Sequence, residues 1–290
     1  MDALIFKIGL PIALAITMLG MGLGLTLADF SVVFTKPKAF FTGAILQLII
    51  LPLIAFAVIS AMPMAAPFAV GMMILAACPG GATSNILTYV GRGDVALSVS
   101  LTALISLVGF ITIPLITAWA LDAFMGDSAP DLPIGKTMLG VLVIVVIPIA
   151  IGMLVHQISP RLAAMAEKLV RPLSIIVFLF VVASIVYVER DNILDYFQQV
   201  GIQVIALNLL MMILAAMVAN AMNLTGPQRT AITLECGLQN STIGLTIALT
   251  ILGNIQMSVP LAVYGLTMLV TGFIYAIFVK GRMKENENDV

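Results

Sequence analysis

The chain has 290 residues, of which 61% are hydrophobic and only 9% are charged. Soluble domains carry about 25% charged residues, so this composition excludes a soluble globular protein. The formal net charge of −1 identifies no partner, and we expect neither nucleic-acid binding nor an obligate protein partner. Both cysteines, Cys78 and Cys236, lie in apolar stretches, which excludes an extracellular disulfide framework.

Apolar runs of 18 or more residues recur along the chain, which predicts an all-α polytopic protein embedded in a lipid bilayer. Nine transmembrane helices are expected, at 3–28, 38–62, 66–91, 95–124, 134–157, 170–188, 199–222, 227–252 and 258–279. The first run lacks a small-residue cleavage site, so it is interpreted as a span and not as a signal peptide. The mixed segment 159–169 predicts a short interfacial helix, and 281–290 is expected to be a cytoplasmic tail.

The positive charges divide unequally between the two sets of span ends. One set holds ten cations: Lys36, Lys38, Arg92, Arg161, Lys168, Arg171, Arg229, Lys280, Arg282 and Lys284. The opposite set holds three: Lys7, Lys136 and Arg190. The positive-inside rule therefore places the N-terminus outside and the C-terminus in the cytoplasm of a cell membrane, which we expect to be a bacterial inner membrane. This orientation requires an odd number of spans, as nine is.

Polar, glycine-containing segments interrupt the third and eighth predicted spans, at 78–85 and 235–240. These spans are five apart and therefore cross the membrane in opposite directions. The pattern predicts an inverted repeat of five spans that lacks its first helix, with two discontinuous helices that cross. The first repeat and the start of the second fall within 1–158, and the second repeat covers 134–280.

Glu235 is the one acidic or basic residue deep inside an apolar span. A charge at bilayer depth costs roughly 2.5–3.5 kcal/mol on insertion scales, so such residues generally serve a function. A purely structural carboxylate, paired with backbone or with Arg229, is the alternative. Broken helices at this depth would expose carbonyls suited to a hard cation and N–H groups suited to an anion.

The motifs Gly20–Leu25, Cys78-Pro79-Gly80-Gly81 with Ser84-Asn85, Arg92–Ser98 and Glu235-Cys236-Gly237-Leu238-Gln239-Asn240 resemble the bile acid:sodium symporter family. The resemblance covers essentially the whole chain. It implies two sodium ions beside the crossing of the broken helices. The first site would use Ser84, Asn85, Ser98, Thr102 and Glu235. The second would use Gln47, Glu235, Gln239 and the backbone carbonyls of Cys236 and Leu238.

The resemblance also implies a core domain, 38–124 with 199–279, that moves against a panel domain, 3–28 with 134–188. The last span offers only Tyr264 and Thr267 as polar residues in 264–269, so a small organic anion is expected and not a bile acid. The predicted substrate contacts are Ala82, Thr83, Asn240, Ser241 and Thr267. The N-terminal ends of the two second half-helices favour negative charge there.

The sequence therefore predicts a sodium-coupled symporter of a small organic anion that works by alternating access. The alternative is a proton-coupled or uncoupled permease or exporter for another solute, such as a metalloid or organic acid, in which Glu235 would act with Cys78. An intramembrane enzyme is disfavoured because no paired acid–base set or Ser/His set lies at matching depth. The glycines at 20, 22 and 24 are interpreted as a close helix-packing surface.

Overall fold

The computed structural model describes residues 9–288, and the elements in that range are all helical, which confirms the all-α prediction. The first half contains α2 (Leu10–Leu23), η2 (Leu27–Ser31), α3 (Val32–Thr35), α4 (Pro37–Ile45), η3 (Leu46–Ile50), α5 (Leu51–Ala61), α6 (Ala66–Ala77), α7 (Ala82–Val90), α8 (Val95–Met125) and η4 (Gly126–Ser128). The second half contains α9 (Ile134–Val141), η5 (Leu142–Val146), α10 (Ile147–Ile158), α11 (Pro160–Val188), α12 (Ile193–Ala221), α13 (Gly226–Gly237), α14 (Ser241–Thr246), η6 (Ile247–Ile251) and α15 (Ile255–Asn288).

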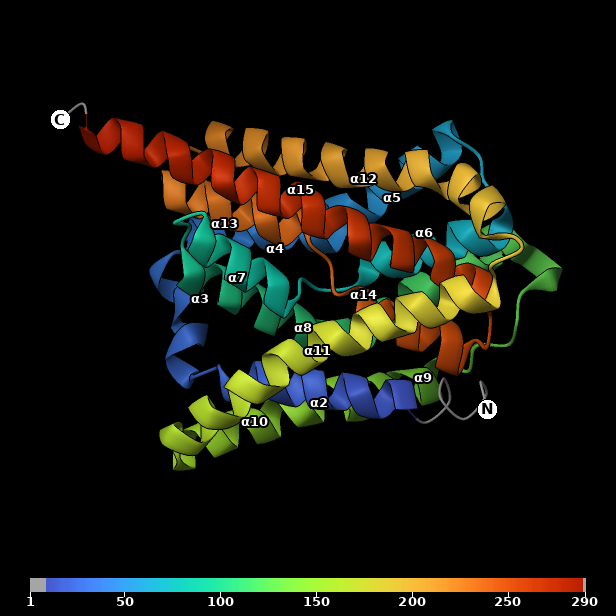
Figure 1. Cartoon of the computed structure of the whole chain (residues 1–290), viewed down its shortest axis with the longest axis horizontal. Coiled ribbons are helices and arrows are strands. Elements are labelled where there is room, and N and C mark those ends of the chain that lie inside the picture. The colour runs from blue at the N-terminus through green and yellow to red at the C-terminus, as the bar shows by residue number, and fades with distance from the viewer. Residues whose placement is uncertain (1–8, 289–290) are drawn as a thin grey trace.

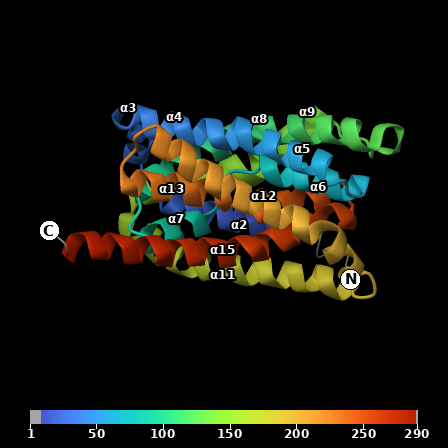
Figure 2. The same cartoon turned by 90° about the horizontal axis from the view of Figure 1, so that it is seen from above.

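The helices run side by side along the long axis of the molecule (Figure 1). Helix α2 begins at the right-hand end of this view, and α15 ends at the left-hand end. Both views show α15 beside α12, and the two helices are in contact. Figure 2 shows α4 and α8 on the side away from α11 and α15. Figure 1 shows the short helices α7 and α14 between α15 and α2, and both short helices are in contact with α15.

Five helical segments of the described chain are long and apolar enough to cross a membrane: Pro37–Ala61, Val95–Ser128, Ile134–Ile158, Ile193–Ala221 and Ile255–Gly281. The pair Leu10–Leu23 and Leu27–Thr35 passes the same test only as one span bent by 77°. These segments make the chain a multi-pass membrane protein. The other three predicted spans contain shorter apolar helices, Ala66–Ala77, Ile176–Val188 and Ser241–Ile251. The count of nine and the inverted repeat stay predictions.

The packing of α2 on α10 depends on glycine, as the sequence predicted for the run at 20–24. A Cβ atom on Gly22 would overlap the backbone carbonyl of Ile149, and one on Gly152 would overlap the backbone of α2. On the next face of α2, a Cβ on Gly20 would overlap the side chain of Val170. Small residues let helix backbones approach closely in a membrane protein, so α2, α10 and α11 form one tightly packed group (Figure 1).

The predicted boundary between an interfacial helix at 159–169 and a span at 170–188 is wrong. A single helix, α11, runs from Pro160 to Val188 with Pro172 in its interior. Pro is tolerated inside membrane helices because neighbouring helices and local adjustments satisfy the backbone groups that it frees. At the other end of the chain, α15 continues through most of the predicted tail, to Asn288.

The start of α8 is fixed to its neighbours by Asp94. Its Oδ1 atom accepts a hydrogen bond from the Leu97 N–H and caps the helix, and its Oδ2 atom lies 2.5 Å from the Lys36 Nζ atom. The Asp94 N–H donates to the carbonyl of Pro227, just inside the first turn of α13. Because α8 and α13 both carry predicted sodium ligands, this contact sets the register between two walls of the candidate site.

Candidate functional site

The two interrupted spans meet at their interruptions. Helix α6 ends at Ala77 and α7 starts at Ala82, while α13 ends at Gly237 and α14 starts at Ser241. Gly80 and Gln239 form an antiparallel bridge, and the Asn240 N–H donates to the Pro79 carbonyl at 2.8 Å. The extended segments of the two breaks therefore satisfy part of each other's backbone, as buried non-helical chain in a membrane protein requires.

The carboxylate of Glu235 lies in a ring of hydroxyl groups at this crossing. Its side chain is fully buried. The Ser84 and Ser98 hydroxyls donate to Oε2 at 2.7 and 2.9 Å, and the Thr102 hydroxyl donates to Oε1. The structure thus brings Ser84 from α7, Ser98 and Thr102 from α8, and Glu235 from α13 to one point, although up to 151 positions separate them in sequence.

Asn85 completes the first predicted set. Its Oδ1 atom accepts from Ser98 at 2.8 Å and lies 3.4 Å from the Thr102 hydroxyl. The site holds more acceptor oxygens than hydroxyl hydrogens, since the single hydrogen of Ser98 faces both Asn85 and Glu235. Thr88, which the sequence analysis missed, donates to the Ser98 hydroxyl at 3.3 Å. Its position one helical turn after Ser84 was the available signal.

Gly80 explains how Glu235 can approach the first break. A Cβ atom at this position would overlap the Oε1 atom of Glu235. At the adjacent Gly81, by contrast, a Cβ would meet its nearest neighbour, the Asn240 Cα, at an ordinary 3.7 Å. Gly80 is therefore required by close packing against the carboxylate, and Gly81 is not.

Gln47 and Gln239 form a second polar group on the other side of Glu235. The Gln47 Nε2 atom donates to the Glu235 carbonyl at 2.7 Å, and the Gln239 Nε2 atom donates to the Cys236 carbonyl at 3.0 Å. Both amide oxygens are buried without a hydrogen-bond partner among the described residues. An unsatisfied buried acceptor costs about 1–3 kcal/mol, and a ligand bound by these oxygens would remove that cost.

Local sequence places Gln47 in a π-helical turn, η3, within the span that α4 begins and α5 completes. Pro52 follows this turn in the first turn of α5. Proline lacks a backbone N–H, and a π-helical turn is a common way to accommodate the lost hydrogen bond. A second π-helical turn, η5, precedes Pro148 in the same way. Single π turns occur frequently at functional sites.

Two further buried residues hold the end of α13 and were not among the predicted site residues. The Asn208 Nδ2 atom and the Tyr264 hydroxyl both donate to the Gly237 carbonyl, at 2.8 and 2.9 Å. Both side chains are fully buried. The signal in the sequence was an isolated amide, Asn208, within the apolar span at 199–222. The sequence marked Tyr264 only as a polar residue of the last span.

A small cavity of about 70 Å³, which we call the break cavity, lies against both breaks. Four of the five predicted substrate residues line it: Ala82, Thr83, Asn240 and Ser241. Ser241 is nearly fully buried, and its hydroxyl has no hydrogen-bond partner in the described part of the chain. The prediction for Thr267 differs from the structure. Its hydroxyl donates to the Val263 carbonyl of its own helix, and the adjacent Met268 and Leu269 line the cavity instead.

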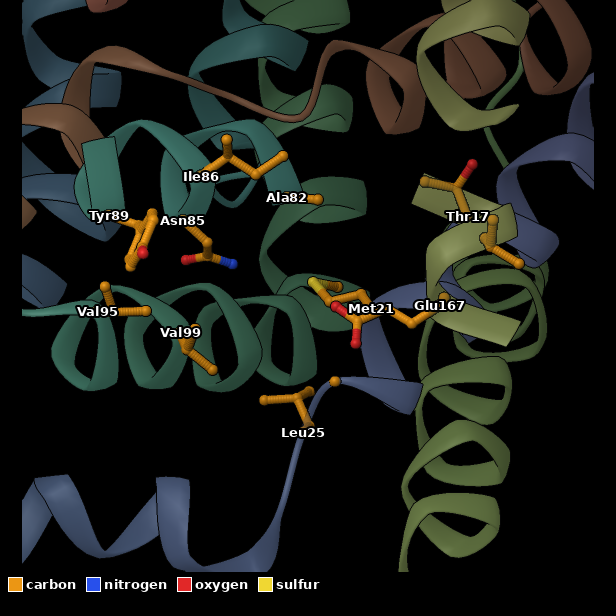
Figure 3. A pocket seen from close by; sticks show the side chains of 13 residues that line it. Thr17, Met21, Leu25, Ala82, Asn85, Ile86, Tyr89, Val95, Val99 and Glu167 are labelled. Carbon is orange, nitrogen blue, oxygen red and sulfur yellow. The ribbon is translucent and has the colours of Figure 1, made fainter. Parts of the chain in front are cut away.

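A larger cavity of about 360 Å³, the large cavity, continues from the break cavity (Figure 3). Thr17, Ala82 and Ile86 line both. The Asn85 amide and the Glu167 carboxylate line the large cavity, from α7 and α11. Asn85, which belongs to the oxygen cluster around Glu235, therefore borders an open space between α2, α7, α8 and α11.

The ligand chemistry of the site is that of a hard cation. Carboxylate, hydroxyl, amide and carbonyl oxygens converge here, and hard cations prefer such donors. Within residues 9–288, no group of three or more His, Cys, Asp or Glu side chains could hold a metal ion. The oxygen donors that are present therefore fit a hard cation. Cys78 donates to the Ile74 carbonyl at 3.2 Å, as a buried helix residue does.

Comparison with known proteins gives a consistent group of relatives. The model of the Sodium Bile acid symporter family matches residues 11–196. The chain is 29% identical to the uncharacterized sodium-dependent transporter YocS of Bacillus subtilis, over 96% of this chain and 85% of the relative. It is 29% identical to the probable sodium/metabolite cotransporter BASS1 of Arabidopsis thaliana, over 91% of this chain and 65% of that protein. It is 32% identical to the human ileal sodium/bile acid cotransporter, over 61% of this chain and 51% of that protein.

Proposed function

The chain belongs to the sodium bile acid symporter family, and from this premise we propose that it is a secondary active transporter that moves two sodium ions and one small organic anion together by alternating access. It is a membrane transporter and not an enzyme. The observation that carries the proposal is the pairing of the two breaks, which puts Glu235 among three hydroxyl donors at the centre of the bundle.

The first proposed sodium ion binds among the oxygens of Ser84, Asn85, Ser98, Thr102 and Glu235. Five side-chain oxygen ligands and one negative charge suit a monovalent hard cation. The excess of acceptors over hydroxyl hydrogens supports this assignment. When sodium binds, the hydroxyl hydrogens turn away from the carboxylate and their oxygen lone pairs face the ion. The large cavity, which Asn85 lines, supplies a path for the ion.

The second proposed sodium ion binds between Gln47 and Gln239, with Glu235 and the carbonyls of Cys236 and Leu238. The two unpartnered amide oxygens support this site, because a cation would satisfy both at once. The amide nitrogens already donate to carbonyls of α13, so each oxygen is oriented before the ion arrives. Pre-orientation lowers the ordering cost of binding.

The proposed anion site is the break cavity, at Ala82, Thr83, Asn240 and Ser241. The first N–H groups of α7 have no intrahelical acceptors, and the positive end of the helix dipole favours an anion. Two adjacent sodium ions would add positive charge. The unpartnered Ser241 hydroxyl supplies a further donor. Linkage then requires sodium to tighten anion binding and the anion to tighten sodium binding.

We propose that the protein lies in the cell membrane, with its N-terminus outside and its C-terminus in the cytoplasm. Most of the cations lie near the ends of α3, α7 and α15 and the starts of α11 and α13, and these helix ends lie at one end of the bundle (Figure 1). The positive-inside rule assigns that end to the cytoplasm. The proposed panel domain, 3–28 with 134–188, contains α2, α10 and α11, and the tight packing of these three helices supports its movement as a unit.

The test is uptake into proteoliposomes that contain the purified protein. Radiolabelled small carboxylates would be offered with an inward sodium gradient, with choline in place of sodium, and with a proton gradient alone. Accumulation of one carboxylate only with sodium is the expected result. Accumulation driven equally by protons in choline would contradict sodium coupling and favour the proton-coupled permease. Transport of a metalloid with no response to any carboxylate would contradict the anion assignment.

A further inference from the structure

The carbonyl of Gly237, at the start of the second break, has lost its partner within the helix. In a continuous helix it would accept the N–H of Ser241, four residues on. The break prevents this, since the Ser241 N–H donates to Gln239 instead. Two side chains from different helices replace the lost donor: Asn208 from α12 and Tyr264 from α15. A buried carbonyl needs one partner, and this one has two.

The last carbonyls of α13 divide into two groups. Those of Glu235 and Cys236 accept from the side chains of Gln47 and Gln239, which belong to the second sodium site. The Gly237 carbonyl faces away from these amides, towards Asn208 and Tyr264. Its lone pairs are engaged by neutral donors, so it is removed from the set of possible cation ligands. This division matches the proposed ligands, which include the carbonyls on either side of Gly237 and not that of Gly237 itself.

Gly237 is also the residue at which the backbone could most easily turn. Glycine has the widest range of backbone dihedral angles. No other residue fits here, because a Cβ atom would overlap the Met212 side chain. The peptide planes on each side of a glycine rotate easily unless hydrogen bonds to other groups fix them. The plane between Gly237 and Leu238 is fixed on its N–H side by the bond from Leu238 to the Leu234 carbonyl, and on its carbonyl side by the two side-chain donors.

We propose that Asn208 and Tyr264 are positioning residues of the second sodium site. By holding the Gly237 carbonyl they direct the flanking carbonyls of Cys236 and Leu238 at the ion. Neither residue touches sodium or substrate in this arrangement. The proposal rests on the proposed function, because it requires a sodium ion at Gln47 and Gln239. It assigns a role in cation affinity to two buried residues that lie behind the site.

The test measures sodium binding without transport. Purified protein in detergent is unfolded thermally across a sodium series, with choline chloride keeping the ionic strength constant. A ligand that binds only the folded state raises the melting temperature with the logarithm of its concentration once that concentration exceeds Kd. The series therefore gives the sodium concentration at which stabilisation sets in, here called the sodium midpoint, and a slope that reports the number of bound ions. The main variant is Tyr264→Phe, which removes one oxygen atom, and Asn208→Leu is the second, from a different helix. The matched control is Tyr275→Phe, on the same helix but about three turns further from the break.

We expect each main variant to raise the sodium midpoint about tenfold, a factor that corresponds to one hydrogen bond, and to lower the slope towards that of one site. Tyr275→Phe keeps the wild-type midpoint. If both main variants lower the melting temperature in choline but leave the sodium midpoint unchanged, their role is structural only and the proposal is wrong. If the wild-type protein gains no stability from sodium over choline, the proposed function fails and this proposal fails with it.

Discussion

The two proposed sodium sites share Glu235 but differ in how their oxygen atoms are partnered. In the first site, every named side-chain oxygen already has a hydroxyl neighbour. The network contains four hydroxyl groups, those of Ser84, Thr88, Ser98 and Thr102. In the second, two amide oxygens are buried without a partner in the described chain. The oxygens of the first site therefore satisfy one another without an ion, whereas the second site carries an energetic penalty that a bound ion would remove. This contrast predicts that the second site is the less tolerant of losing a single ligand.

The largest effect is expected from Glu235→Gln, because this residue is common to both sites. The substitution keeps the size of the side chain, removes the charge, and places an amide donor among hydroxyls that already donate. Removing one charge of a buried ion pair costs several kcal/mol, so sodium-driven uptake should fall about 100-fold or more. Glu189→Gln, at the end of α11, is the control. Uptake by the Glu235→Gln protein with wild-type sodium dependence would contradict the shared role.

Gly80→Ala should have the next largest effect, because its Cβ atom would displace the Glu235 carboxylate. We expect the sodium midpoint of thermal stabilisation to rise at least tenfold, because displacement of the Glu235 carboxylate affects both sites. Gly81→Ala is the matched control. Its Cβ atom meets Asn240 at an ordinary distance, so sodium stabilisation should persist. Equal behaviour of the two variants would show that the contact with Glu235 is unimportant.

A direct comparison of the two sites uses Gln47→Leu and Ser98→Ala. The leucine keeps the volume of Gln47 and removes one of the two unpartnered oxygens, so the sodium midpoint should rise about tenfold. The alanine removes one of three hydroxyls around Glu235 and leaves two, so a change of only a few-fold is expected. Isothermal titration with sodium chloride into protein in choline buffer would measure both. A larger effect for Ser98→Ala would reverse the proposed ranking of the sites.

Local chemistry made much of this arrangement predictable. Glu235 stands out because a charge at bilayer depth is costly, and the glycine-containing interruptions near it indicate where helices break. The bridge between Gly80 and Gln239 could not be derived in the same way, because pairing between distant breaks depends on three-dimensional packing. The resemblance to a known family supplied the remaining ligands, such as Gln47.

Other features depended on contacts that a sequence does not display. Asn208 reads as one amide in an apolar span, and only the fold shows that it faces the Gly237 carbonyl. The helix boundary at 170 was misplaced because the mixed composition of 159–169 indicated a separate element, whereas packing against α2 and α10 continues one helix across it. Thr267 was selected for its polarity, although a threonine hydroxyl in a membrane helix can bond to its own helix instead.

The smallest effects are expected at Ser241 and Thr267, two of the predicted substrate residues. Here too, one residue has an unpartnered oxygen and the other has a partnered one. The Ser241 hydroxyl is buried at the break cavity without a partner, so an anion there would supply its acceptor. Loss of this donor in Ser241→Ala should raise the KM for the transported carboxylate about three- to tenfold, as one hydrogen bond to a charged group would predict.

The Thr267 hydroxyl already donates to Val263 at 2.9 Å. Thr267→Val keeps the branched shape and removes only this internal bond, so KM should change less than twofold. Both proteins should keep the wild-type sodium midpoint, because neither residue belongs to a cation site. A large rise in KM for Thr267→Val, with none for Ser241→Ala, would mean that the hydroxyl of the last helix turns to the substrate during transport. The anion would then be bound by α15, and the unpartnered group at the break would need another explanation.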